Sequence, residues 1–305
     1  MLQLNIKDEV SRLRSVVLGR ADDSGPVPTL EETYDPKSAK HIRQGTYPTI
    51  PDMVMEMEAV NKVFEKYDVK VYRPKLIPDY NQIFTRDIAF VIEDKFIIGN
   101  ILEDRSKEID AIEYIISKIQ PENVIRFPEE AHVEGGDVMP WGDYIFVGTY
   151  KDDNYRAYIT ARTNMKAVEE LQKLFPNKKV KSFSLRKSNS VPKENALHLD
   201  CCFQPIGMGK AIIHKNSFLI NEEYQWLVDF FGKENIFEIT DEEMTQMFSN
   251  IVSIAPDVVL SEQKFYRLNE WLREQGFTVE EVPYAEISKQ SGLLRCSTLP
   301  LFRDK

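Results

Sequence analysis

Val69-Lys-Val-Tyr-Arg73 begins the stretch of sequence that decides the fold. Two apolar segments follow it, residues 85–91 and 95–99, and the turn Glu93-Asp94 between them predicts a β-hairpin. Residues 105–119 come next, with isoleucines at helical spacing along one face. The stretch therefore predicts a unit made of a short strand, a hairpin and an amphipathic helix.

The same unit recurs along the chain. Short strands that follow a helix are expected to begin near residues 69, 124, 180, 236 and 277, a spacing of roughly 40–55 residues that is typical of propellers and repeat arrays. The further hairpins are expected to turn at Trp141-Gly-Asp143, Gly207-Met-Gly209 and Ala255-Pro-Asp257, and the further helices to cover residues 163–175, 222–231 and 262–274.

The two ends of the chain supply the parts of a fifth unit. The strand Ser15-Val-Val-Leu18 has no earlier partner and residues 295–302 have no strand after them, so we expect these two strands to pair. A helix over residues 51–67 completes the unit. The predicted fold is an α/β five-bladed ββαβ propeller with pseudo-symmetry, closed by pairing of the N- and C-terminal strands, in a single domain of residues 1–305. An ordinary open α/β sheet is the alternative.

Composition narrows the class of protein. Of 305 residues, 42% are hydrophobic and 29% are charged, the balance of a globular domain with a substantial core. The formal charge of −10 repels a phosphate backbone, so we expect no nucleic-acid partner. No apolar run approaches the ~20 residues of a membrane span, and acidic residues interrupt the N-terminus. We therefore expect no membrane contact. Three cysteines, two of them adjacent, cannot form a disulfide framework and favour a reducing compartment, so we expect a cytoplasmic location.

Ionisable residues interrupt the apolar sequence at one point of the repeat, where each hairpin begins. In a closed ring these points would face a common axis. Ionisable groups at the same position of several distant segments are hard to ascribe to chance. The residues are Asp87, Glu134, Asp137, His198, Asp200 and Cys296.

His198 and Asp200 form the clearest pair among these residues. If residues 196–203 form a strand, alternation places both side chains on one face and two leucines on the other. A histidine beside a carboxylate suits general acid–base catalysis. The solvated face of a half-buried strand would give the same pattern.

Asp87 and Glu134 call for partners as well. Asp87 precedes a run apolar enough to be buried on both faces, so its carboxylate must be paired, either with a ligand or with neighbouring Arg86. Gly135-Gly136 lets the backbone approach a ligand closely beside Glu134. A plain tight turn explains these glycines equally well, but it does not explain Glu134.

Cys296 is ambiguous by itself, because a free cysteine is usually a small buried apolar side chain. It follows Arg295, at a position of the ring equivalent to that of His198, and either residue could supply the positive charge that a reactive thiolate needs. Cys201 and Cys202 lie in an expected apolar strand, and we place them in the core.

A metal site is a further alternative. No HExxH, CxxC or paired-histidine spacing supports one, so we expect no metal and no cofactor. The potential ligands are His132, Glu134, Asp137, His198 and Cys296.

Four motifs together, in their order along the chain, resemble the guanidino-group-modifying enzymes. They are Phe84-Thr-Arg-Asp87, Glu134-Gly-Gly-Asp137, His198-Leu-Asp200 and Cys296 near the C-terminus. This superfamily includes arginine deiminases, dimethylarginine dimethylaminohydrolases and amidinotransferases. The resemblance spans nearly the whole chain and implies a five-bladed ββαβ (pentein) propeller, in agreement with the ring inferred from the repeat.

The resemblance also implies a chemistry. Cys296 would attack the guanidinium carbon and form a covalent amidino-thioether, while His198 would protonate the departing amine and then activate water. Asp87, Glu134 and Asp200 would bind the guanidinium, which presents five N–H donors to carboxylates, and Glu134 would share in proton transfer.

Other residues take their roles from the resemblance alone. Asp137 would orient the loop of Glu134, and Arg105 and Arg162 match positions that bind the α-carboxylate of the substrate, which favours an arginine-like amino acid over agmatine. The inserted segment Lys151-Asp-Asp-Asn-Tyr-Arg156 would cover the site. The motifs combine features of several subfamilies, so the individual guanidine stays open.

We therefore expect a cysteine-dependent hydrolase acting on a small guanidino compound of the arginine type. The alternative is an amidinotransferase, in which an amine replaces water as the second nucleophile. A non-catalytic module that binds a cation is the alternative from another class. The sequence leaves self-association into a homo-oligomer open.

Overall fold

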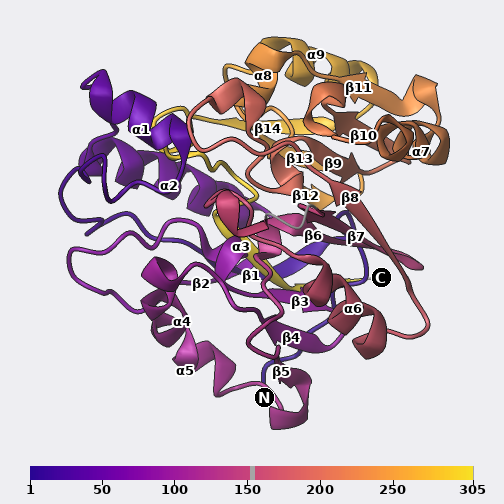
Figure 1. Cartoon of the computed structure of the whole chain (residues 1–305), viewed down its shortest axis with the longest axis horizontal. Helices are drawn as coiled ribbons and strands as arrows, with labels where there is room; N and C mark the ends of the chain where they lie inside the picture. Colours follow the sequence, from indigo (N-terminus) through magenta and orange to yellow (C-terminus); the bar gives the residue numbers. More distant parts are fainter. Residues whose placement is uncertain (152–154, 305) are drawn as a thin grey trace.

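Five small sheets form the framework of the protein. The computed structural model describes residues 1–151 and 155–304, and within them every sheet has three strands, an antiparallel pair and a third strand parallel to the middle one. In Figure 1 the sheets lie toward the middle, and the helices other than α3 lie toward the outside. The sheets are β15 (Thr298–Arg303), β1 (Leu13–Leu18) and β2 (Lys70–Tyr72); β3 (Phe90–Ile92), β4 (Lys95–Ile98) and β5 (Val124–Arg126); β6 (Val138–Trp141), β7 (Tyr144–Thr149) and β8 (Lys179–Ser184); β9 (Phe203–Ile206), β10 (Lys210–Ile213) and β11 (Ile236–Glu238); and β12 (Val252–Ala255), β13 (Val258–Glu262) and β14 (Thr278–Val282).

The helices other than α3 and α8 connect the hairpins to the third strands, whereas α3 and α8 each precede a hairpin. Local signals fix their starts: Thr49 caps α2 by accepting from the backbone of Asp52, and Asn164 caps α6 in the same way. The apolar face of α2, including Val60 and Phe64, is fully buried in the core beside β1. The helices are α1 (Pro36–Arg43), α2 (Ile50–Lys66), α3 (Thr85–Ile88), α4 (Lys107–Ala111), α5 (Glu113–Ile116), α6 (Met165–Leu174), α7 (Asn221–Phe231), α8 (Asp241–Thr245) and α9 (Tyr266–Glu274).

The predicted repeat agrees with these elements. The third strands begin at residues 70, 124, 179, 236 and 278, each within one residue of its expected start. The N- and C-terminal strands pair as expected, antiparallel, with Val16 opposite Pro300 and Leu18 opposite Thr298. A mixed α/β fold with five repeated sheets is therefore established.

Two elements expected between residues 85 and 119 were wrong. Residues 105–119 form two short helices, α4 and α5, separated at Ile112, because a run rich in β-branched isoleucine has a weak helix propensity. Residues 85–91 do not form one strand: a single helical turn, α3, precedes β3.

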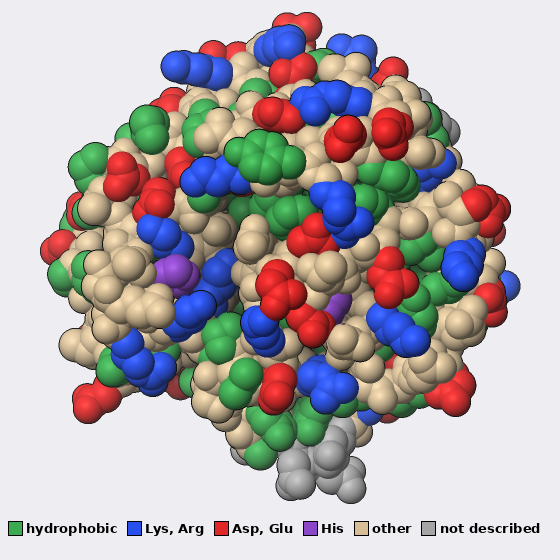
Figure 2. Space-filling model, turned by 90° about the horizontal axis from the view of Figure 1, so that it is seen from above, with side chains coloured by type: hydrophobic (Ala, Val, Ile, Leu, Met, Phe, Trp, Pro, Cys, Tyr) green, Lys and Arg blue, Asp and Glu red, His purple; other side chains and the backbone are tan. Residues whose placement is uncertain are grey.

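The surface carries charges of both signs. Figure 2 shows acidic and basic side chains interspersed over one face, without a continuous basic area. In the part of the chain that the structure describes, no helix is both long enough and apolar enough to cross a bilayer.

Candidate active site

A helical turn precedes the hairpin in at least four of the units, and these turns carry the ionisable residues. They are α3 (Thr85–Ile88), the 3₁₀ turns Gly135–Asp137 and Leu199–Cys201, and the turn over residues 294–297 before β15. The expected strand over residues 196–203 was therefore wrong. His198 and Asp200 are both buried, and their place in the site follows from the turn and not from strand alternation.

Cys296 lies on the last of these turns with its thiol in an acidic setting. The amide Nδ2 of Asn250 is 3.1 Å from Sγ, and the carboxylate oxygens of Asp200 are 3.7 and 3.9 Å from it. Burial, followed by the charges of Asp200 and Asp87, raises the pKa of the Cys296 thiol far above its usual range. In the free protein Cys296 is therefore a thiol at neutral pH.

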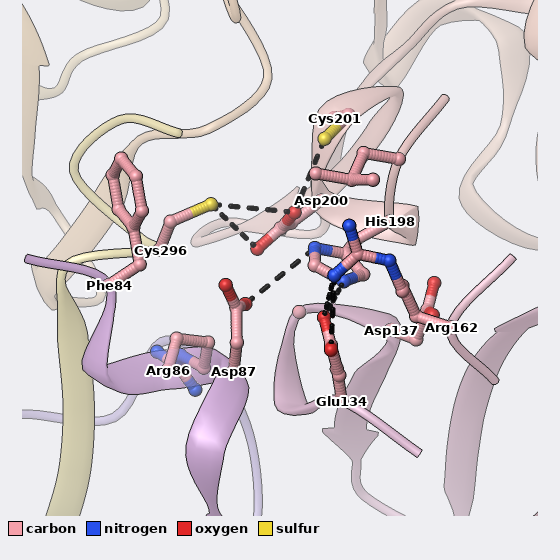
Figure 3. A network of polar contacts seen from close by, with 12 residues as sticks. Phe84, Arg86, Asp87, Glu134, Asp137, Arg162, His198, Asp200, Cys201 and Cys296 are labelled. Atoms are coloured by element: carbon pink, nitrogen blue, oxygen red, sulfur yellow. Dashed lines mark hydrogen bonds and ion pairs between the residues drawn. The ribbon is translucent and has the colours of Figure 1, made fainter. Parts of the chain in front are cut away.

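His198 lies between two carboxylates. Its Nε2 is 2.8 Å from Oε2 of Glu134, and its Nδ1 is 3.6 Å from Oδ1 of Asp87. Burial alone would lower the pKa of His198, but the charge of Asp87 and the hydrogen bond to Glu134 raise it to about 9. The ring is therefore an imidazolium at neutral pH. Figure 3 shows this ring and the Cys296 sulfur pointing toward one another across Asp87 and Asp200.

Gly136 makes room for this histidine. A Cβ at this position would lie 2.6 Å from Nδ1 of His198 and 3.0 Å from Oδ1 of Asp87, too close for any other residue. Those two atoms also make no hydrogen bond within the described residues, so they stay available to a ligand.

The two arginines expected to bind the α-carboxylate of the substrate are paired with acids in the free protein, and both line the cavity described below. Nη1 of Arg105 donates to Asp87 at 2.7 Å, and its Nε donates to Glu108 at 2.7 Å. Nη1 of Arg162 is 3.1 Å from both carboxylate oxygens of Glu134. Burial raises the pKa of Glu134, but the charge of Arg162 and the hydrogen bond to His198 outweigh it and lower that pKa well below its usual range.

Asp137 connects two of the turns. It accepts from Oγ1 of Thr163 at 2.6 Å and from the backbone N–H of Leu199 at 2.8 Å. Within the described residues, the hydrogen bonds of Asp137 go to Thr163 and Leu199 and not to Cys296. This arrangement suits the orienting role expected of Asp137.

A cavity of about 570 Å³ opens above these residues. Phe84, Asp87, Arg105, Arg162 and Leu197 are part of its lining, while Cys296 and His198 lie behind that lining, only 2% and 1% exposed.

Residues 24–47 form one wall of this cavity, a part of the chain that the sequence left without a role. Within it, Asp35 caps α1 and accepts from Ser291, and the backbone carbonyl of Tyr34 accepts from Arg162 at 3.1 Å. The segment 151–156 was expected to cover the site. Residues 152–154 of this segment lie outside the described part of the chain, so the expectation is not tested.

Sequence reasoning missed three residues of this site. Asn250 precedes β12 at the same point of the repeat as Asp87 and His198, so the repeat itself carried the signal that could have found it. Glu108 has no comparable signal. Neither has Glu9, which contacts Arg295 across 286 positions of sequence.

Arg295, one of the two residues expected to supply positive charge near Cys296, is paired with acids. Its guanidinium donates to Asp200 at 2.9 Å and to Glu9 at 3.1 Å, and within the described residues it makes no hydrogen bond to the Cys296 sulfur. Cys201 and Cys202 are buried as expected, in a turn and at its end; Cys201 contacts Asp200 at 3.7 Å.

Asp87, Glu134 and His198 are also the one group whose ligand atoms, within the described residues, lie close enough to hold a metal ion, all within 4.8 Å of one another. Each of these groups is at the same time engaged with another or with an arginine. The donor set suits a cationic ligand of either kind, a metal ion or a guanidinium.

Comparison with known families agrees with this geometry. The family model described as N,N dimethylarginine dimethylhydrolase, eukaryotic, matches residues 37–303. The fold, the site and this match place the protein among the enzymes that modify guanidino groups. More narrowly, the chain belongs to the family of the N,N dimethylarginine dimethylhydrolases.

Individual relatives cover several activities of this class. The arginine deiminase of Oenococcus oeni (strain ATCC BAA-331 / PSU-1) is 25% identical over 291 residues, which is 82% of this chain and 67% of the deiminase. The N-terminal domain of ArgZ, an arginine dihydrolase of cyanobacteria, gives a TM-score of 0.78 at 18% identity over 95% of this chain and 97% of that one. SxtG, an amidinotransferase from Microseira wollei, gives 0.75 at 17% identity over 99% and 98%. The two structural likenesses show a shared fold.

Proposed function

We propose that the protein is a cysteine-dependent hydrolase that cleaves a C–N bond in the guanidino group of arginine or an arginine-like amino acid. The observation that carries this proposal is the meeting of Cys296, His198 and three carboxylates, from four distant segments, behind a single cavity. A guanidinium ion is planar and rich in donors, so carboxylates are its natural partners.

Binding of the substrate would activate the nucleophile. The Cys296 thiol is held protonated by burial and by the charges of Asp200 and Asp87. A guanidinium placed between these carboxylates offsets their charge and lowers the pKa of the thiol. The thiol proton then passes to solvent, where the released ammonia or amine takes up one proton, and Sγ attacks the guanidinium carbon.

The first half of the reaction forms a new C–S bond and breaks a C–N bond. His198, an imidazolium in the free protein, donates its proton to the departing nitrogen, which leaves as ammonia or an amine. The product on the enzyme is a positively charged amidino-thioether on Cys296, and His198 is then neutral.

The second half restores the enzyme. Neutral His198 removes a proton from water, and the resulting hydroxide attacks the amidino carbon. Collapse of this adduct breaks the C–S bond, releases a ureido product, and returns one proton to the Cys296 thiolate. The overall reaction consumes one guanidinium and one water and yields the ureido compound and an ammonium ion.

Arg105 and Arg162 would exchange partners during binding. In the free protein their guanidinium groups occupy the carboxylates of Asp87 and Glu134, as a substrate guanidinium would. When the substrate takes over these carboxylates, the two arginines become free to hold its α-carboxylate. This exchange supports an arginine-like amino acid over a guanidine without a carboxylate.

Product analysis tests the proposal. The purified protein is incubated with arginine, methylated arginines, agmatine and guanidino acids, and products are identified by mass spectrometry. We expect a ureido product and a released amine or ammonia from an arginine-type substrate, and none from Cys296→Ser. Turnover by Cys296→Ser at the wild-type rate would refute the mechanism.

The same assay separates the hydrolase from an amidinotransferase. A hydrolase turns over with arginine as sole substrate. An amidinotransferase would need a second amine, such as glycine, and would deliver the amidino group to it.

We also infer that the five sheets close into a five-bladed propeller within one domain of residues 1–305. The pairing of β1 with β15 supports this inference. A single cooperative thermal transition, lost when β1 is disrupted by Val16→Asp, is the expected behaviour, and an unchanged transition would contradict it.

A further inference from the structure

Glu9 is a buried carboxylate that lies far in sequence from the turn that carries Cys296. It lies in the N-terminal segment before β1 and is 3% exposed. Its two oxygens accept from Nη2 and Nε of Arg295 at 3.1 and 3.2 Å. Arg295 is fully buried and directly precedes the Cys296 nucleophile.

The remaining donors of Arg295 reach the site itself. Nη1 donates to Oδ2 of Asp200 at 2.9 Å, and Nη2 donates to the carbonyl of Val138 at 2.9 Å, just after the turn of Glu134. One planar guanidinium therefore joins the N-terminal segment to two of the turns. A forked donor of this kind fixes the direction of a carboxylate as well as its charge.

We propose that Glu9 and Arg295 are a positioning pair that fixes the carboxylate of Asp200 and sets the charge that the Cys296 sulfur meets. Neither residue touches the sulfur among the described contacts, so they act through Asp200. Their significance for catalysis rests on the proposed function, but their effect on the thiol does not.

The charges around the pair show why Glu9 is needed. Arg86 and Arg303 are buried beside Arg295, and Arg86 lies 3.9 Å from Glu9. Burial raises the pKa of Glu9, but the charges of Arg295 and Arg86 outweigh it and lower that pKa to about 2. Glu9 is therefore ionised at neutral pH and balances cations that would otherwise act on Asp200 and the thiol without compensation.

Several other groups face Cys296 and must stay unchanged in a test. They come from several elements around the sulfur. They are Asp200 and Cys201 from one turn, Asp87 from α3, Asn250 before β12, Lys37 from α1 and Tyr284 after β14.

Glu9→Gln removes the balancing charge with little change of shape. The thiol then meets a more positive environment, so its pKa falls. Because Glu9 acts through Arg295 and Asp200, we expect a fall of about one pKa unit, less than the direct effect of the Asp200 charge at 3.7 Å from Sγ. Because the thiolate is the reactive form, alkylation of Cys296 by iodoacetamide at neutral pH becomes about tenfold faster.

The experiment measures the rate of Cys296 alkylation against pH, with peptide mapping to separate it from the other two cysteines. Glu9→Asp keeps the charge and should follow the wild-type profile. Glu56→Gln is the matched control: Glu56 is an equally buried acid that accepts from the backbone of Glu286 and Ile287, and its loss should leave the profile unmoved.

The proposal would be overturned if the alkylation profile of Glu9→Gln coincided with that of the wild type. The pair would then be only a structural ion pair, whatever the melting temperature of the variant. Equal shifts in Glu9→Gln and Glu9→Asp would overturn the charge argument. If Glu9→Gln does not fold, Arg295→Lys carries the test, because one ammonium cannot hold both carboxylates: an alkylation profile of Cys296 that is shifted from the wild type supports the pair, and a profile that superimposes on it contradicts the pair. Alkylation needs no turnover, so failure of the proposed hydrolysis would be seen separately.

Discussion

Replacing Asp200 with Asn should release the thiol of Cys296 from its protonated state. The two side chains have the same shape, but Asn carries no charge. The nearer oxygen of Asp200 lies 3.7 Å from Sγ, and both groups are buried. At an effective dielectric of about 20, a unit charge at that distance is worth about 4 kcal/mol, or about three pKa units, as an upper bound.

The sign follows from the charge of the thiolate. A nearby anion disfavours the thiolate and raises the pKa, so its removal lowers the pKa, and the positive charge of Arg295 adds to the effect. We expect a fall of about two units, which makes alkylation by iodoacetamide at neutral pH about a hundred times faster. Turnover should nevertheless fall, because the guanidinium loses one of its carboxylates.

The assay is the alkylation rate of Cys296 against pH in the free protein. Asp137→Asn is the matched control, because Asp137 is also a buried aspartate but binds Thr163 and Leu199 instead of the thiol. Profiles of Asp200→Asn and wild type that superimpose would refute the electrostatic account of this site.

Other consequences concern proton transfer and substrate binding. His198→Asn should lower kcat by ~10²–10⁴-fold, since general acid–base catalysis contributes about that much, and an unchanged kcat would remove His198 from the mechanism. The pKa of His198 is raised to about 9, so the imidazolium needed by the leaving nitrogen is present below that pH and lost above it; kcat/KM should fall as pH rises through about 9, and a profile still rising at higher pH would contradict this. Arg105→Lys and Arg162→Lys should raise KM at least about tenfold for arginine but not for agmatine, which has no carboxylate; equal effects on both substrates would exclude the proposed contact.

The order and spacing of the elements could be predicted from the sequence because they depend on local signals. Alternating apolar strands, turn residues and helix faces repeat in each unit, and the third strands start within one residue of their expected positions. The pairing of β1 with β15 followed from counting strands without partners. Neither step required knowledge of long-range contacts.

The helical turns that hold the site could not be predicted from local sequence patterns. Leu199–Cys201 is only three residues long, and Asp137 stabilises its start through the Leu199 N–H, 62 positions away. A pattern of strand alternation fits the same residues, so the sequence favoured a strand. His198 and Asp200 were identified correctly as neighbours, but for a reason that the structure does not support.

The pairing of the charges was also hidden. The sequence contains the carboxylates and the arginines, but whether Arg105 binds Asp87 or a ligand depends on distances set by the packing of the units against one another. Asn250 could have been found by extending the repeat to the fourth unit. Glu9 could not, because its partner lies at the opposite end of the chain.

The most direct measurement is the mass of the Cys296 peptide after a rapid acid quench during turnover of the preferred guanidino compound. We predict an increase equal to the amidino group, confined to the peptide that contains Cys296 and missing from Cys296→Ser. Sustained turnover with no modified peptide at any quench time, or with the added mass on another residue, would contradict the covalent role of this cysteine.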